Sequence, residues 1–355
     1  MKNFIFTFNY VINYGAFLQC FALFSLNEDN IVADLMPCNI LDYKHSVGAY
    51  GRKRFPFIWR LLALKRYCST FYFARKLAFK ENKKIVLTKR FLFWDGKKAK
   101  RILDKNNAIV GSDQVWNPKF IGGRERIFFA NIADYSKRIA YAVSLGVKKW
   151  PEHFEQQVLP YIEKFDAISV REKSALEYLQ SIGIKNVAWT CDPTLLHDAS
   201  FYRNEFGIRR HVSSQVFVYT IRENVPQAYL DNDYCDAFFV NAGKKKNIIS
   251  VSEWLSHIDA SKYIITDSFH CVVFCLLFHK NFIVLRNNSR GKGMNERFIS
   301  LLGRTKLMYR CIESGEPVES VKERLFRYVD WACIDRIIDE WRQYSLNWLK
   351  NALDS

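Results

Sequence analysis

One short segment of the sequence combines a carboxylate, a hydroxyl and an imidazole. Asp267, Ser268 and His270 stand between a strand-like run at residues 262–266 and an apolar run that continues to residue 279. A helix that begins here would direct its free N–H groups and its dipole toward these side chains, and both attract anions. His270 could then bind a phosphate or transfer a proton. The alternative is structural, with Asp267 or Ser268 capping the helix and His270 as a buried polar residue.

A second polar cluster, Gly111-Ser112-Asp113-Gln114, directly follows the apolar run at residues 107–110. Ligands of parallel sheets bind at the carboxyl ends of the strands, so these polar groups are candidates for substrate contacts. The alternative is an Asx-type turn that leads into a helix.

A third candidate segment, NYGAFLQ at residues 13–19, follows the first apolar run of the chain. Gly15 has no side chain and would allow the backbone to approach a ligand closely. Ordinary turn chemistry is the alternative, and the segment taken alone favours it.

Arg171 is the first candidate cation. It directly follows the buried run at residues 165–170, which would direct its guanidinium into a cleft. The planar guanidinium group suits a carboxylate or a phosphate. The alternative is an ion pair with a nearby carboxylate such as Glu172 or Asp192.

The segment RNNSRGKGMNER at residues 286–297 supplies further cations around two glycines, namely Arg286, Arg290, Lys292 and Arg297. This pattern is typical of a mobile loop that closes on an anion. A solvated basic loop is the alternative.

The elements that must position these residues alternate between short β-rich runs and helical patterns, which is typical of an α/β fold with parallel strands. The expected strands are residues 107–110, 138–143, 165–170, 186–190, 215–221, 237–240, 247–251, 262–266 and 281–285. The expected helices are residues 151–164, 171–182, 252–260, 268–279, 295–302 and 321–349, the last as one helix or two. The helix at 252–260 is expected to open on Ser252 and Glu253.

The domain organisation follows from length and from missing motifs. A chain of 355 residues favours two domains. Neither G-x-G-x-x-G nor G-x-x-x-x-G-K-[ST] occurs, which argues against a nicotinamide dehydrogenase and a P-loop NTPase. We expect two Rossmann-like domains, residues 1–205 and 206–355, with a ligand cleft between them. The boundary is placed near the polar stretch at 197–213, and the last helices are expected to pack back on the N-terminal domain.

The net charge of +17 is concentrated in one block. Residues 52–105 contain 18 lysines and arginines against three acidic residues, interleaved with aromatic residues. Such a block fits contact with an anionic membrane face or a lipid-linked substrate. It fits equally a solvated basic insertion whose aromatic residues pack in the core, and it fits nucleic acid least well.

The expected compartment is the cytoplasm, at or near the inner face of the membrane. The sequence has no apolar segment of membrane-spanning length and no convincing signal-peptide pattern. Its nine cysteines have no metal-ligand spacing and are typical of reduced structural thiols. We therefore expect neither a metal nor a cofactor.

Taken together, these segments resemble the polysaccharide pyruvyl transferase family. The matching pieces are NYGAFLQ, VGSDQVWNP, YAVSLG, ISVREKSA, the DPTLL run and ITDSFH, and they occur in the family's order between residues 13 and 302. The chain departs from many relatives by having Cys271 after DSFH, and from some by having Ser268 where they have arginine.

The resemblance implies a glycosyltransferase-B-like architecture, phosphoenolpyruvate as the donor co-substrate and a sugar of a surface polysaccharide precursor as the acceptor. The acceptor could be linked to a lipid diphosphate, and the product would be a pyruvate ketal. The N-terminal domain would bind the acceptor and the C-terminal domain the donor. A nucleotide-sugar-dependent glycosyltransferase of the same architecture is the competing hypothesis, and a nucleic-acid-binding protein is supported only by the basic block.

The resemblance also assigns roles to residues. His270 matches the family's donor-site histidine and is the expected general acid, with Asp113 or Asp267 as the base. The expected donor-binding residues are Arg171, Ser268, Phe269, His270, Lys292 and Arg297. The expected acceptor-binding residues are Asn13, Tyr14, Gly15, Gln19, Ser112, Asp113 and Gln114.

Overall fold

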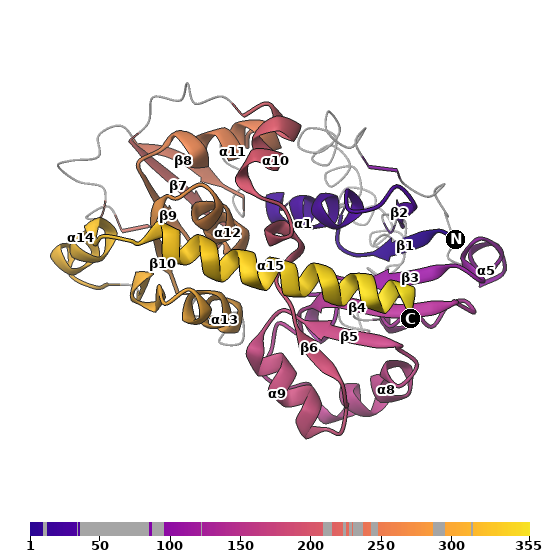
Figure 1. Cartoon of the computed structure of the whole chain (residues 1–355). Helices are drawn as coiled ribbons and strands as arrows, with labels where there is room; N and C mark the ends of the chain where they lie inside the picture. Colours follow the sequence, from indigo (N-terminus) through magenta and orange to yellow (C-terminus); the bar gives the residue numbers. More distant parts are fainter. Residues whose placement is uncertain are drawn as a thin grey trace, which may run out of the picture. The chain divides into compact units, whose positions relative to one another are not determined.

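The computed structural model of the chain has two parallel β-sheets with helices packed against them (Figure 1). The structure describes residues 1–9, 13–33, 35, 85–86, 96–121, 123–208, 215–222, 225–226, 229, 237–242, 248–286, 295–313 and 315–355. Arg290, Lys292 and most of the basic block at residues 52–105 lie outside these ranges.

The first sheet has six parallel strands in the order β2-β1-β3-β4-β5-β6. The strands are β1 (Asn3–Phe6), β2 (Asn30–Val32), β3 (Asn107–Val110), β4 (Lys137–Val143), β5 (Ala167–Val170) and β6 (Val187–Trp189). Every residue of β1 and β3 is buried, as in other parallel sheets that are covered on both faces. The four strands predicted between residues 107 and 190 are confirmed.

The described helices that lie between or after the strands of this sheet in the sequence, as far as residue 181, are α1 (Tyr14–Phe24), α5 (Gly96–Leu103), α6 (Pro118–Ile121), α7 (Glu125–Phe128), α8 (Glu152–Ile162) and α9 (Lys173–Ser181). Much of the core beside the sheet is aromatic. The Trp116 ring stacks on Phe129 with centroids 4.9 Å apart and meets Trp150 edge-on at 6.0 Å. These rings pack the segment that follows β3 firmly against its neighbours.

The second sheet has five parallel strands in the order β11-β10-β9-β7-β8. The strands are β7 (Val216–Thr220), β8 (Ala237–Asn241), β9 (Tyr263–Thr266), β10 (Asn281–Leu285) and β11 (Cys311–Ile312). The strands predicted at residues 215–221, 237–240, 262–266 and 281–285 are confirmed. The α/β class with parallel strands is therefore confirmed for both sheets.

The helices in the second part of the sequence are α10 (Ala199–Phe206), α11 (Val251–Ala260), α12 (Phe269–Leu277), α13 (Glu296–Arg304), α14 (Val318–Phe326) and α15 (Trp331–Asp354). All nine side chains of α12 are buried, as its apolar sequence requires. Within the described part of the chain, no helix combines the length and the apolarity needed to cross a membrane.

The chain divides into two compact units, each containing one sheet. Unit 1 comprises Met1–Ile12, Ala16–Pro193 and Ser345–Ser355, and unit 2 comprises Asn13–Gly15 and Thr194–Tyr344. Two helices contribute residues to both units, because α1 begins in unit 2 and α15 ends in unit 1.

The polar stretch at residues 197–213, interpreted as a boundary, contains α10. The Asp198 side chain accepts a hydrogen bond from the Phe201 N–H at 2.8 Å and caps the helix. Gly207 ends it in the left-handed conformation with φ of 56°. Only Tyr202 and Phe206 are buried in this helix, so its apolar periodicity is too weak to predict it from sequence.

The strand predicted at residues 247–251 is wrong. Described residues 248–250 form no strand, and Val251 is the first residue of α11. The helix opens on Ser250 rather than on Ser252, because Ser250 and Glu253 form a capping box. The Ser250 hydroxyl accepts from Glu253 N–H at 3.1 Å, and the Glu253 carboxylate accepts from Ser250 N–H at 2.7 Å.

Replacing Ser250 with alanine should lower the free energy of unfolding by about 1 kcal/mol, because the Glu253 N–H loses its acceptor. The measurement is the midpoint of urea unfolding. Ser355→Ala, at the exposed end of the chain, is the control and should leave the midpoint unchanged. Equal midpoints for the two variants would show that the capping box contributes nothing.

Candidate active site

His270 lies in the first turn of a buried helix at the carboxyl edge of the second sheet. Strand β9 ends at Thr266, and the Ser268 hydroxyl caps α12 by accepting a hydrogen bond from Cys271 N–H at 3.4 Å. The structural interpretation, in which Ser268 caps the helix, is therefore confirmed. His270 itself is only 3% exposed, so its imidazole is held by the surrounding protein.

The His270 ring packs directly against the backbone of Gly15. A Cβ added at Gly15 would lie 2.0 Å from His270 Nδ1 and 2.2 Å from Cγ, so no side chain fits at residue 15. Gly15 is in the first turn of α1, where its N–H donates to the Asn13 side-chain oxygen at 2.9 Å. The N-termini of α1 and α12 thus meet at one imidazole.

Tyr14, the residue before Gly15, is anchored in unit 2. Its ring stacks on Trp254 with centroids 5.0 Å apart, and its hydroxyl donates to the Ile249 carbonyl at 2.9 Å. Tyr14 is almost completely buried. The first turn of α1 is therefore fixed against the same unit that carries His270, and this contact positions Gly15.

The electrostatics around His270 favour an anion. His270 is in the first turn of α12 and packs on the first turn of α1, and helix N-termini attract negative charge. The Arg297 guanidinium lies 5.8 Å from the Phe269 ring centroid, beside the residue that precedes His270. The arrangement can hold an oxyanion next to a group able to donate a proton.

Asp267 uses both carboxylate oxygens on backbone groups. One accepts from Ile221 N–H at 2.6 Å and the other from Arg222 N–H at 2.7 Å. Asp267 therefore fastens the segment after β7 to the start of α12. Both oxygens therefore accept backbone donors, and the predicted role of Asp267 as the base stays a prediction.

Asp113 lies in the loop that follows β3 in unit 1. Gly111 precedes it with φ of 119°, and a Cβ there would lie 2.2 Å from the Tyr141 carbonyl oxygen, so the loop requires glycine. Asp113 adopts φ of 67°, and its carbonyl accepts from Ser144 N–H at 3.0 Å. This hydrogen bond joins the loop to the residue that directly follows β4.

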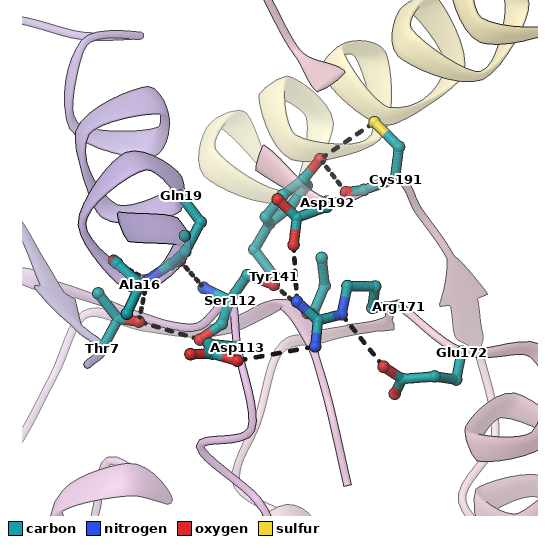
Figure 2. Close-up of polar contacts among 12 residues, drawn as sticks. Thr7, Ala16, Gln19, Ser112, Asp113, Tyr141, Arg171, Glu172, Cys191 and Asp192 are labelled. Atoms are coloured by element: carbon teal, nitrogen blue, oxygen red, sulfur yellow. Dashed lines mark hydrogen bonds and ion pairs between the residues drawn. The ribbon is translucent and has the colours of Figure 1, made fainter. Parts of the chain in front are cut away.

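A buried network holds the same loop from the side of α1 (Figure 2). The Gln19 amide donates to the Thr7 hydroxyl at 2.8 Å and accepts from Ser112 N–H at 3.0 Å. The Ser112 hydroxyl donates to the Ala142 carbonyl at 2.6 Å. Gln19 and Ser112 are completely buried. These contacts position the loop, and the predicted acceptor contacts of both residues stay predictions.

Gln114 is also engaged within the protein. Its side-chain oxygen accepts from the Asn117 amide at 2.8 Å, and both groups pack against Gly146 so closely that a Cβ there would lie 2.2 Å from the Asn117 amide nitrogen. The GSDQ and SLG segments therefore form one packed unit at the ends of β3 and β4.

Arg171 is surrounded by carboxylates (Figure 2). Its guanidinium lies 2.7 Å from Asp192, 3.1 Å from Glu172 and 3.7 Å from Asp113. Burial would lower the pKa of Arg171, but the three negative charges raise it above its ordinary value, so the group stays charged. The ion pairs with Glu172 and Asp192 that the sequence left open are present. The predicted donor contact of Arg171 stays a prediction.

Several of these relationships have no signal in the sequence. Examples are the stacking of Trp254 on Tyr14, the hydrogen bond from Gln19 to Thr7 and the two backbone N–H groups bonded to Asp267. The positions of these residues in the sequence give no indication that they are in contact. Among the residues that the structure describes, no group of three His, Cys, Asp or Glu side chains could hold a metal ion.

Comparison with known proteins adds one finding about this geometry. A family model described as polysaccharide pyruvyl transferase matches residues 13–289, more than half of the chain. The matched region begins at Asn13, before the first turn of α1, and extends past His270, so it includes both polar clusters. Comparison with curated proteins gives no match.

Proposed function

The chain belongs to the polysaccharide pyruvyl transferase family, and from this premise we propose that it transfers pyruvyl from phosphoenolpyruvate to a sugar of a surface polysaccharide precursor, forming a pyruvate ketal. The observation that carries the proposal is the position of His270 where two helix N-termini meet. Phosphoenolpyruvate carries a phosphate and a carboxylate, and its reaction needs a proton donor. The arrangement supports both requirements.

The proposed reaction begins with proton transfer from His270 to C3 of phosphoenolpyruvate, which makes C2 electrophilic. A sugar hydroxyl attacks C2 while a carboxylate accepts its proton. Phosphate leaves as its bond to C2 breaks, and a second hydroxyl attacks C2 and gives its proton to the released phosphate, which closes the ketal. The oxyanions of the donor are stabilised by the helix N-termini and by cations on unit 2, of which Arg297 is the candidate near Phe269.

We propose Asp113 as the base of this reaction. The Asp267 oxygens already accept two backbone N–H groups. Asp113, in contrast, lies 3.7 Å from the Arg171 guanidinium, which is longer than a hydrogen bond. Its loop is held in place by the hydrogen bond from Ser112 N–H to the Gln19 side chain. A carboxylate held by its backbone can present an oxygen to a hydroxyl group without reorganising.

The proposal extends to substrates and location. Unit 2 would bind the donor, with Ser268, Phe269 and Lys292 assisting His270, and unit 1 would bind the acceptor through the loop of Asp113. The arrangement would be glycosyltransferase-B-like, with a cleft for the two substrates. The protein would act in the cytoplasm at an anionic membrane face, on an acceptor that includes lipid-diphosphate-linked sugars, and it would require no cofactor.

Millimolar phosphoenolpyruvate should raise the melting temperature of the protein, since a ligand that binds only the folded state stabilises it. UDP and UDP-sugars are the parallel ligands. Stabilisation by the UDP compounds alone would contradict the proposal and favour a nucleotide-sugar-dependent glycosyltransferase.

His270→Ala should lower turnover by about 10²-fold or more, because the general acid is lost. Phosphate release from phosphoenolpyruvate, measured with a panel of lipid-linked and nucleotide-linked sugar acceptors, provides the readout. His153→Ala, an exposed histidine in α8, is the matched control. Near-normal turnover of His270→Ala would remove His270 from the chemistry.

A further inference from the structure

The segment that follows β7 is fixed beside the helix that carries His270. Strand β7 pairs in parallel with β9, and the last pair in their register is Tyr219 with Thr266. The Thr266 hydroxyl donates to the Tyr219 carbonyl at 2.6 Å, which ties the two strand ends together. The residues directly after both strands therefore lie at the same carboxyl edge of the sheet, where ligands of such sheets bind.

Asp267 fixes the next step of this segment. Its two oxygens accept the N–H groups of Ile221 and Arg222 at 2.6 and 2.7 Å. Asp267 itself is buried and stands one residue before the cap of α12. The backbone of Arg222 is thus within hydrogen-bonding distance of the segment that positions His270, and this placement does not depend on the Arg222 side chain.

Arg222 is an exposed residue. A guanidinium binds carboxylate and phosphate oxygens in pairs, and an exposed one is accessible to a ligand. Arg297, at the first turn of α13, lies against Phe269. The backbone of Arg222 and the guanidinium of Arg297 thus contact two different residues of the segment that leads to His270, Asp267 and Phe269.

We propose that Arg222 is a further donor-binding residue, which contacts a carboxylate or phosphate oxygen of phosphoenolpyruvate and is positioned by Asp267. This inference rests on the proposed function, because it takes the donor to be phosphoenolpyruvate. The donor carries two anionic groups, and a single imidazole cannot compensate both. Asp267 is then a positioning residue that holds the backbone of Arg222 next to the start of α12.

The test compares Arg222→Ala and Arg222→Lys with the unmodified protein. The bond to Asp267 is made by the backbone N–H of Arg222, so both variants keep that contact. Arg222→Ala should raise the KM for phosphoenolpyruvate about 10-fold or more with kcat changed less than threefold, because a charge-assisted contact is lost. The KM of Arg222→Lys should lie between the values of the unmodified protein and Arg222→Ala, since lysine keeps the charge without the paired donors.

A binding measurement makes the result independent of turnover. The concentration of phosphoenolpyruvate that gives half-maximal thermal stabilisation should rise in Arg222→Ala by the same factor as KM. Lys262→Ala is the matched control, because Lys262 is an exposed cation directly before β9, at the opposite edge of the same sheet. It should leave both quantities unchanged.

The outcomes separate the two hypotheses. If the unmodified protein shows no stabilisation by phosphoenolpyruvate, the proposed function fails and this inference fails with it. If the unmodified protein is stabilised and Arg222→Ala is stabilised at the same concentrations, the proposed function stands and Arg222 is not a donor-binding residue. An equal loss of affinity in Lys262→Ala would likewise overturn the inference, because the effect would then reflect net charge alone.

Discussion

Alanine in place of Gly15 is expected to lower turnover by about 10²-fold or more, as much as removal of the proposed general acid His270. The added Cβ would lie 2.0 Å from Nδ1 and 2.5 Å from Cβ of His270, far inside van der Waals contact. Because α12 is buried along its length, the imidazole must move rather than the helix. The displaced ring no longer lies at the two helix N-termini. Phosphate release with saturating donor and acceptor measures the loss.

Gly303→Ala is the matched control for this prediction. Gly303 lies in the exposed part of α13, and a Cβ there would meet nothing within 4 Å. This variant should keep full turnover and gain up to about 1 kcal/mol of stability, since alanine favours a helix interior. Gly15→Ala should also lose thermal stability, because the collision cannot be relieved without repacking. Full turnover of Gly15→Ala would show that the imidazole is not required at this position.

Methionine in place of Arg171 should lower the free energy of unfolding by about 3–5 kcal/mol, because it leaves buried carboxylates without their counter-charge. Asp192 and Glu172 are almost inaccessible and lie within 3.1 Å of the guanidinium. Urea unfolding, followed by tryptophan fluorescence, provides the measurement. The loss of stability should appear in the absence of any substrate, which distinguishes it from an effect on donor binding.

Arg286→Met is the comparison for Arg171. Arg286 pairs with Glu313 at 2.9 Å, but about a third of the arginine and half of the glutamate are exposed. Exposed ion pairs contribute about 0–1 kcal/mol, so the midpoint should hardly change. An Arg171→Met protein as stable as Arg286→Met would mean that the three carboxylates are not held in the pairs described.

The sheet strands show what the sequence can predict. Apolar runs bounded by polar turns gave β3 to β7, β9 and β10 close to their observed bounds, because a buried parallel strand is apolar on both faces. The same rule fails at residues 247–251, because this short apolar run leads into α11, which begins at Val251. Ser250 starts the helix there, because it forms a capping box with Glu253, three residues later.

The candidate site was predicted as separate polar segments, and their contacts could not be predicted. His270 and Gly15 are 255 positions apart, and nothing in either segment indicates that one packs on the other. The sequence also left open whether Arg171 binds a ligand or a carboxylate, because a buried cation needs a counter-charge in either case. Three-dimensional packing resolved the carboxylate partners, and Arg222 became a candidate only through the two amides on Asp267.

The complete burial of α12 has a consequence for how the reaction is prepared. A histidine on a surface loop must be reordered each time a substrate binds, and part of the binding free energy is used for that step. In the proposed reaction, a histidine on a helix whose nine side chains all lie in the core would start each turnover already oriented. The barrier would then be lowered by dipoles that need no rearrangement as charge develops. Acceptance of a new sugar would have to arise elsewhere, because α12 cannot be reshaped without loosening the core that surrounds it.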